Sequence, residues 1–295
     1  MERMGLGYES CVELNPEIVY ATVAAFGTDG PYAERPGIDV VFQGESGMIS
    51  ITGDRDDGPR KTATTIGDYV AGNNAALAVA AALAENPRRP RRIDVSLLDG
   101  AMAVQSGWNA IQFATGEQPE RTGTASPFLA PNRVFRAADD LFTLAIVSDR
   151  HFQIMSEAVG RPELANDYPT NAERMEHRDE LDAMLQEIFA TEPADHWLEV
   201  FGSAGLPCGR VLTLAEAFDD PQAKHHEMLV EHDHPVAGLV KTTGSPIRIG
   251  GAPARSDGSP PPLGADTRSI LAELGLDDAT IEAMVADGGA VSHGG

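Results

Sequence analysis

Apolar runs and helical patterns alternate in the first part of the chain. Residues 18–25 (IVYATVAA) are apolar and β-branched, which is typical of a buried strand. The alanine-rich segment 69–85 predicts a long helix, because alanine has the highest helix propensity. The segment IDVSLLDGAMAV, which begins at Ile93, predicts another buried strand that runs into a helix. This order of strand, helix and strand indicates an α/β fold with a parallel sheet.

Two other segments of this part have weaker patterns. Residues 2–14 predict a helix that ends at Asn15, which is followed by a proline. Residues 38–52 are apolar but contain Gly44 and Gly47, so we expect strand-like pieces that are interrupted by glycine.

The second part of the chain mixes a hairpin with helices. Residues 133–147 predict a hairpin with two aspartates near its turn. Residues 171–190 predict an amphipathic helix. Its apolar face consists of Leu181, Met184, Leu185 and Ile188. Thr213 and Glu216 have the spacing of a capping box. Residues 251–264 are rich in Pro, Gly and Ser and predict a linker, which two short helices follow.

Composition and charge limit the class of protein. The chain has 295 residues, of which 42% are hydrophobic, enough for a sizeable core. A net charge of −23 repels phosphate backbones, so we expect no nucleic-acid partner. No apolar run reaches the length of a membrane span, and the first residues do not form a signal peptide, so we expect a cytoplasmic protein without a membrane partner. The two cysteines, Cys11 and Cys208, are far apart and indicate neither a disulfide framework nor a zinc site.

Six segments resemble those of a known family. They are NPEIVYATVAAFGTDGPYAERPGIDVVFQGESGMISITGD, IGDYVAGNNAALAVAAAL, RRIDVSLLDGA, GLPCGRVLTLAEAFDDPQ, EHDHPVAGLVKTTGSPIRI and PLGADTRSILAELGLDDATIEAMVADG. In this order they resemble the CaiB/BaiF family of class III coenzyme A (CoA) transferases, and the resemblance covers nearly the whole chain. The family includes formyl-CoA transferase, carnitine CoA-transferase and α-methylacyl-CoA racemase.

The resemblance implies an α/β fold, with a partial Rossmann-like parallel-sheet large domain and a smaller α+β domain. Residues 1–118 would form the large domain with the catalytic aspartate, residues 125–250 the small domain, and residues 262–290 C-terminal helices that return to the large domain. Full-length members begin with a further Rossmann-like stretch that carries much of the CoA pocket, and this chain resembles them from the helix after it. Members of the family form dimers of interlocked chains, so the resemblance implies a homodimer. The difference at the N-terminus alternatively implies a partner that is a separately encoded N-terminal half.

The resemblance assigns the catalytic role to Asp68. This residue matches the family's catalytic aspartate in the G-D-x-x-x-G segment formed with Gly67 and Gly72. A carboxylate can attack a thioester carbonyl to form a mixed anhydride, from which CoA transfer through an aspartyl-CoA thioester follows. The sequence pattern alone favours a structural role for Asp68. It lies just before the predicted helix 69–85, where an aspartate commonly caps the helix.

The resemblance also suggests where CoA would bind. Arg3 and Met4 match positions that contact CoA in formyl-CoA transferase, and Arg35 lies close to the position of a CoA-binding lysine of the family. An arginine suits the phosphates of CoA, because its guanidinium binds phosphate in a bidentate manner. Both arginines are also consistent with ordinary surface cations.

Two other functions remain open at this point. Racemases of the family carry a histidine where this chain has Ile38, and isoleucine cannot exchange an α-proton, which weakens an α-methylacyl-CoA racemase-like function. The chain is alternatively a truncated or half-enzyme subunit that is inactive without its N-terminal partner. We expect CoA thioesters as substrates, no cofactor and no metal. The last expectation includes the histidines at 225, 226, 232 and 234, two of which would share a strand face.

Overall fold

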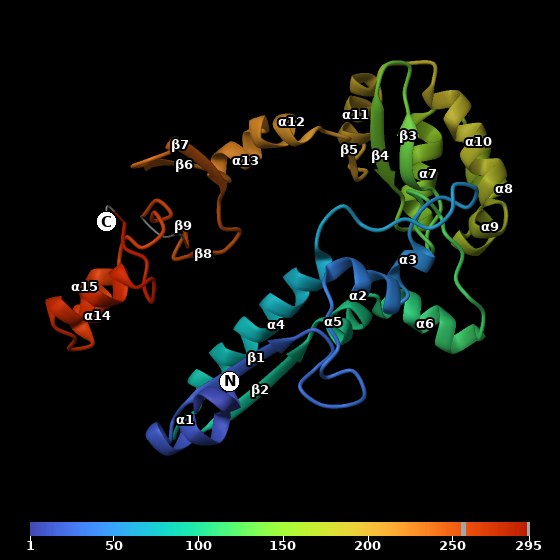
Figure 1. The fold of residues 1–295 in the computed structure, drawn as a ribbon. Coiled ribbons are helices and arrows are strands. Elements are labelled where there is room, and N and C mark those ends of the chain that lie inside the picture. Colours follow the sequence, from blue (N-terminus) through green and yellow to red (C-terminus); the bar gives the residue numbers. More distant parts are fainter. Residues whose placement is uncertain (255–257, 294–295) are drawn as a thin grey trace. The chain divides into compact units, whose positions relative to one another are not determined.

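The computed structural model describes residues 1–254 and 258–293 (Figure 1). The chain forms two compact units, Met1–Arg210 and Val211–Gly295, which we describe separately. The fold is mixed α/β, as the sequence predicts. The division into three segments at 1–118, 125–250 and 262–290 stays a prediction.

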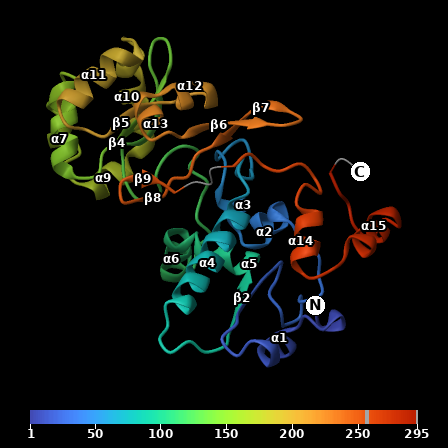
Figure 2. The ribbon, with the colours of Figure 1, turned by 90° about the vertical axis from the view of Figure 1, so that its left-hand side faces the viewer.

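The first unit begins with a parallel strand pair and its crossover helix. Strand β1 (Val19–Ala24) pairs in parallel with β2 (Arg91–Ser96), and helix α4 (Ile66–Leu83) lies between them in the chain. The predicted strands and the alanine-rich helix are therefore confirmed, but the predicted burial is wrong, since no residue of β1 and only Ser96 of β2 is buried. Figure 2 shows α4 beside α5 (Leu97–Ala103) and α2 (Asp39–Glu45). Parallel strands need such a crossover, because a tight turn cannot join them.

The short helices around this pair include one correction. The strands expected over 38–52 were wrong: the segment forms α2 and α3 (Met48–Ile51), separated at Gly47, which has a φ of +87°. Side chains four residues apart share one face of a helix, and Asp39 and Gln43 are both buried on α2. Their burial favours helix over the strand propensity of the β-branched residues between them.

The predicted N-terminal helix is interrupted. Instead of one helix over 2–14, the chain forms the 3₁₀ helix η1 (Glu2–Met4) and then α1 (Tyr8–Leu14). Gly5 has a φ of +68°, a left-handed conformation that ends η1. After α5, helix α6 (Ser106–Thr115) leads towards the second sheet of this unit.

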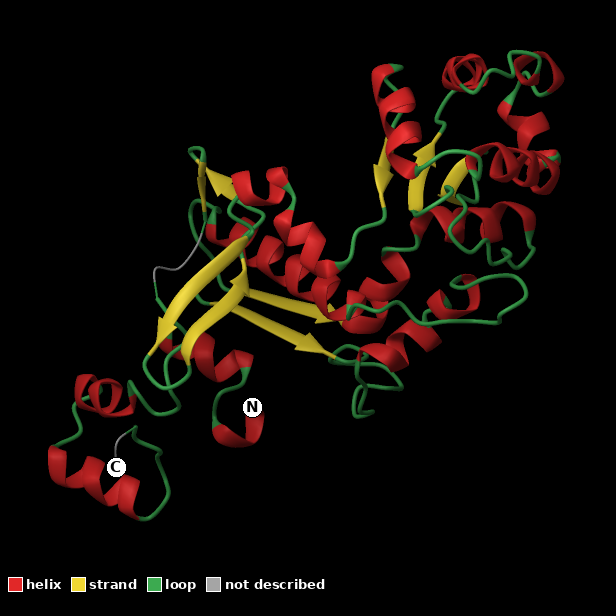
Figure 3. Cartoon of the chain, turned by 90° about the horizontal axis from the view of Figure 1, so that it is seen from above, coloured by secondary structure: helices red, strands yellow, loops and turns green. Residues whose placement is uncertain are grey.

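That second sheet is antiparallel and surrounded by helices. Its strands are β3 (Asn132–Arg136), β4 (Leu141–Ala145) and β5 (Cys208–Arg210), in the order β3-β4-β5. The predicted hairpin over 133–147 is confirmed. Figure 3 shows red helices around these yellow strands. They are α7 (Asp149–Ala158), α8 (Leu164–Asp167), α9 (Asn171–Glu176), α10 (Arg178–Phe189) and α11 (Ala194–Ser203).

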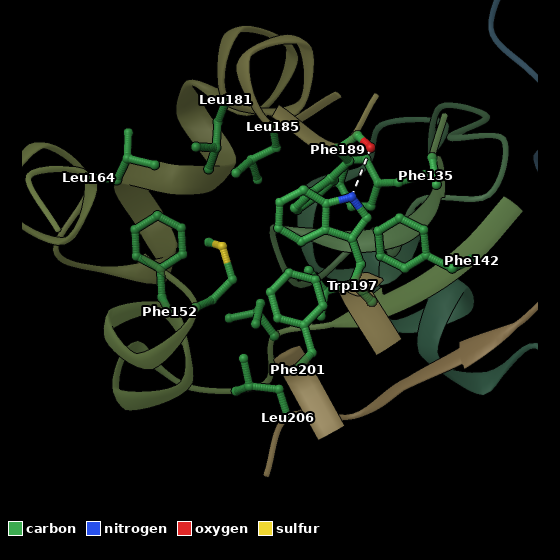
Figure 4. Packing of buried hydrophobic residues seen from close by; sticks show 14 of the residues in the cluster. Phe135, Phe142, Phe152, Leu164, Leu181, Leu185, Phe189, Trp197, Phe201 and Leu206 are labelled. Atoms are coloured by element: carbon green, nitrogen blue, oxygen red, sulfur yellow. Dashed lines mark hydrogen bonds between the residues drawn. The ribbon is translucent and has the colours of Figure 1, made fainter. Parts of the chain in front are cut away.

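An aromatic core fills the space between this sheet and its helices (Figure 4). Phe142 and Phe189 are fully buried and meet edge to face, with ring centroids 5.3 Å apart. The buried Trp197 donates its Nε1–H to the Phe189 carbonyl at 2.8 Å. Leu181 and Leu185 are fully buried and Met184 and Ile188 are partly buried against the cluster, so the predicted apolar face of the 171–190 segment is confirmed.

The second unit contains short elements. Helices α12 (Leu214–Asp219) and α13 (Pro221–His225) precede the antiparallel hairpin of β6 (Leu229–His234) and β7 (Gly238–Thr243). The remaining elements are β8 (Arg248–Ile249), β9 (Ala252–Pro253), α14 (Thr267–Glu273) and α15 (Asp278–Ala286). The predicted capping box of Thr213 and Glu216 is present. Residues 255–257 of the predicted linker lie outside the described residues.

Helices that could cross a membrane were searched for over residues 1–254 and 258–293. Within these ranges no helix is both long and apolar enough for a span.

Candidate functional site

Asp68 lies in the first turn of α4. The helix begins at Ile66, three residues before the predicted start, with Thr65 as its N-cap. Asp68 is therefore the third helical residue rather than a residue that precedes the helix. The side chain of Thr65 makes no capping hydrogen bond, so the N–H groups of this turn are left for other acceptors.

The carboxylate of Asp68 is exposed to solvent. Among the described residues, none makes a hydrogen bond or an ion pair with it, and none accepts from its main-chain N–H. The positive end of the helix dipole stabilises negative charge at such a position. An N–H group without an acceptor can stabilise an oxyanion that forms beside it. The turn thus offers a nucleophilic oxygen and a hydrogen-bond donor at the same residue.

The residue before Asp68, Gly67, is anchored by a main-chain hydrogen bond to Asp39. The N–H of the buried Gly67 donates to Oδ1 of Asp39 at 2.9 Å. Asp39 is 7% exposed, whereas the preceding Ile38 is 69% exposed. The exposed side chain at position 38 is thus an alkyl group, which cannot donate or accept a proton.

Arg35 is already paired in this structure. Its guanidinium forms two hydrogen bonds with the carboxylate of Glu45, one of them 3.0 Å long. It also lies over the Phe26 ring, 4.8 Å from the centroid, and near the Tyr32 ring. A CoA phosphate would have to displace Glu45 to use this guanidinium, and the CoA contact of Arg35 stays a prediction.

The predicted CoA contacts Arg3 and Met4 lie away from Asp68. Both are exposed in η1, and the nearby Leu6 carbonyl accepts from the Tyr20 hydroxyl at 2.9 Å. Tyr20 is near the start of β1, whereas α4 begins beyond the end of β1 (Figure 1). A ligand that touches all three residues must therefore be long, and these two contacts also stay predictions.

The histidines of the second unit have local partners. His232 and His234 share a face of β6, as predicted. Nε2 of His232 lies 3.1 Å from Oγ1 of Thr242, and Nδ1 of His234 accepts from the N–H groups of Val236 and Ala237. No group of three His, Cys, Asp or Glu residues in the described part of the chain could hold a metal ion.

A well-formed cavity of the first unit lies away from Asp68. It has a volume of about 560 Å³ and lies between α6 and α9–α10, with Arg55, Trp108 and His177 in its lining. Arg55 is paired with Glu120 and Asp179, which raise its pKa above the ordinary value. Four acidic residues and two arginines line this cavity, which does not suit the phosphates of CoA.

Reasoning from the sequence predicted a role for Asp68, which stays a prediction, and did not single out Asp39 and Gln43. These residues form a hydrogen-bonded pair behind the first turn of α4. The signal was their i,i+4 spacing in an apolar segment, which has meaning only in a helix. In the strand predicted for residues 38–52, residues four apart do not form such a pair, so the spacing did not indicate a contact between Asp39 and Gln43.

Comparisons with known proteins agree with the sequence motifs. The family model described as CoA-transferase family III matches residues 1–267. The acetyl-CoA:oxalate CoA-transferase of Acetobacter aceti is 35% identical over 85% of this chain, and the succinyl-CoA:glutarate CoA-transferase of Mus musculus is 30% identical over 99%. The alignments cover 64% and 68% of these two relatives. The crystal structure of a CAIB/BAIF family protein from Brucella suis is similar with a TM-score of 0.77 and 33% identity, over 92% of this chain and 72% of that one.

Proposed function

Because the chain belongs to CoA-transferase family III, we propose that it transfers coenzyme A from an acyl-CoA donor to a carboxylic acid acceptor. Asp68 carries the transferred group in this proposal. The observation that supports it is the exposed carboxylate of Asp68, which has no partner among the described residues and lies next to a free main-chain N–H. Asp39, the carboxylate next to this turn, does not combine these features, since it is buried and bonded.

The proposed reaction has four steps, in which every bond broken is matched by one formed. A carboxylate oxygen of Asp68 attacks the thioester carbonyl, and CoA leaves as a thiolate, which gives a mixed anhydride. The thiolate then attacks the aspartyl carbonyl and releases the donor acid, which leaves an aspartyl-CoA thioester. The acceptor carboxylate attacks the aspartyl carbonyl of this thioester, and CoA leaves again as a thiolate, which gives a second anhydride. The thiolate finally attacks the acceptor's carbonyl, which forms the new acyl-CoA and restores Asp68.

The acceptor is a short dicarboxylic acid in this proposal. Oxalate and glutarate, which appear in the names of the two relatives, are both dicarboxylic acids. One carboxylate of such an acid can react while the other is bound, which orients the reacting end. CoA enters only as part of the substrates, and no other cofactor takes part. An α-proton exchange is not proposed, because position 38 is isoleucine.

The expected assembly is a homodimer. Light scattering after size-exclusion chromatography measures the mass of the purified protein and distinguishes a dimer from a monomer.

Intact-mass spectrometry after incubation with acyl-CoA tests the role of Asp68. We expect a covalent adduct equal to CoA less one water on the unaltered chain, and none on Asp68→Asn. The matched control is Asp99→Asn. Asp99 is also exposed and is the third residue of its helix, α5, so its substitution removes an equivalent helix-end charge. An adduct that forms on Asp68→Asn as readily as on Asp99→Asn would contradict the proposal.

A further inference from the structure

A buried carboxylate beside Asp68 has no part in the reaction described above. Asp39, the first residue of α2, is 7% exposed, and its Oδ1 accepts from the Gly67 N–H at 2.9 Å. Gly67 directly precedes Asp68 in the first turn of α4. This hydrogen bond therefore joins α2 to the main chain one residue before the proposed catalytic carboxylate.

Gln43 extends the attachment to the loop that leads into α4. It is fully buried, and its Nε2 donates to Oδ2 of Asp39 at 2.6 Å and to the Thr64 carbonyl at 3.2 Å. Its Oε1 accepts from the N–H of Thr62 at 2.8 Å. The amide and the carboxylate thus use all their polar atoms, and a buried network with every member satisfied is rigid.

Gly67 fits closely against this network. A Cβ at position 67 would lie 3.1 Å from Oδ1 of Asp39, closer than nine in ten real Cβ contacts. The main chain before Asp68 thus approaches Asp39 more closely than a residue with a side chain would allow without a shift.

We propose that Asp39 and Gln43 are positioning residues for Asp68. The inference rests on the proposed function, since it gives these residues a role in the reaction of that carboxylate. Within residues 1–254 and 258–293 no group bonds the Asp68 carboxylate, so its position depends on the main chain of residues 62–67, which the pair holds at three points. A displacement of the order of 1 Å at a reacting group can slow a reaction about 10²-fold.

Exchanging the carboxylate and the amide between positions 39 and 43 tests this role. In Asp39→Asn the new NH₂ faces the NH₂ of Gln43, and in Gln43→Glu the new carboxylate faces Asp39 and the Thr64 carbonyl. Either single variant should form the CoA adduct at least about tenfold more slowly than the unaltered chain. The double variant Asp39→Asn/Gln43→Glu keeps the acceptors for Gly67 and Thr62 and restores a donor opposite an acceptor between positions 39 and 43, although its new carboxylate still faces the Thr64 carbonyl. It should recover part of the rate, which measures the coupling between the two residues.

Two further measurements separate positioning from general stability. Hydrogen exchange followed by NMR should show faster exchange of the Gly67 amide in each single variant and protection again in the double variant. Asp182→Asn is the control. It removes another buried carboxylate of the first unit, which is paired with Arg133 at 2.7 Å, and it should change the melting temperature without slowing adduct formation by the folded protein.

The outcomes distinguish this inference from the proposed function. If the single variants remain folded and form the adduct at the unaltered rate while Asp68→Asn forms none, the positioning role is wrong and the function of Asp68 stands. If the double variant is as slow as the single variants although its Gly67 amide is protected, the positioning role is also wrong. If the unaltered chain forms no adduct but Gly67 exchange follows the expected order, the proposed function fails and the pair holds only the helix.

Discussion

The two sheet regions of the first unit use their apolar residues in opposite ways. Around β3, β4 and β5, a continuous cluster of aromatic and aliphatic side chains is buried, with Phe142, Phe189 and Phe201 at 0% exposure. Beside β1 and β2, helix α4 is apolar on most of its surface, yet its only buried residues are Gly67, Ala71 and Ala82. Large apolar side chains of α4 are exposed instead, among them Leu77 at 70%.

The region that stabilises the fold therefore differs from the region that holds the proposed catalytic residue. The aromatic core buries area that stabilises the fold, and none of the predicted site residues belongs to it. The first turn of α4 is held by hydrogen bonds to Asp39 and Gln43, and its carboxylate faces solvent. A helix that is apolar all round is typical of a buried element, so α4 has the surface of a helix that another element covers.

The largest expected effect on stability is in the aromatic core. Phe142→Ala should lower the free energy of unfolding by about 3–5 kcal/mol, because it removes a buried ring and leaves a cavity. Chemical denaturation followed by tryptophan fluorescence measures the change, since Trp197 lies in the same cluster. The folded fraction should still form the CoA adduct. A loss below about 1 kcal/mol would show that this core does not dominate stability.

A smaller effect is expected at Asp182, at the edge of the same region. Burial raises the pKa of this carboxyl group, and the hydrogen bond from Arg133 opposes the increase. The folded chain therefore binds this proton more tightly than the unfolded chain, so the contribution of Asp182 to stability falls as the pH rises above about 4. The melting temperature of the unaltered chain relative to that of Asp182→Asn should decline as the pH rises above about 4. A relative melting temperature that rises with pH would contradict this sign.

The smallest effect is expected on the exposed face of α4. Leu77→Gln should change the free energy of unfolding by less than about 0.5 kcal/mol in a monomer, because the side chain is 70% exposed. Ala71→Gln, at a buried position of the same helix, is the matched contrast and should be strongly destabilising. A cost of Leu77→Gln that grows with protein concentration would show instead that this face is covered in an oligomer.

The elements that the sequence predicted best have one strong local signal. Residues 18–25 and the hairpin over 133–147 are short apolar segments with turn residues at their ends, and both form the expected strands. The helix over 171–190 was recognised by its period, although the structure divides the segment into α9 and α10 near His177.

The site was only partly predictable from the sequence. The motif predicts a role for Asp68, whereas its place as the third residue of α4 depends on where the helix starts. Asp39 was overlooked because 38–52 contains both β-branched residues and glycines, and local propensity favours strand there. Burial of Asp39 and Gln43 against residues 62–67 reverses that preference, and contacts between residues so far apart in the sequence leave no local pattern.

The most direct test of the account locates the covalent bond. The chain is incubated with acyl-CoA and treated with hydroxylamine, which converts an aspartyl thioester into a hydroxamate, and its peptides are then sequenced by tandem mass spectrometry. The account predicts one hydroxamate, on Asp68, that forms only when acyl-CoA is present. A hydroxamate on a different carboxylate would contradict the assignment of Asp68, and the absence of any hydroxamate while CoA transfer proceeds would contradict the covalent mechanism.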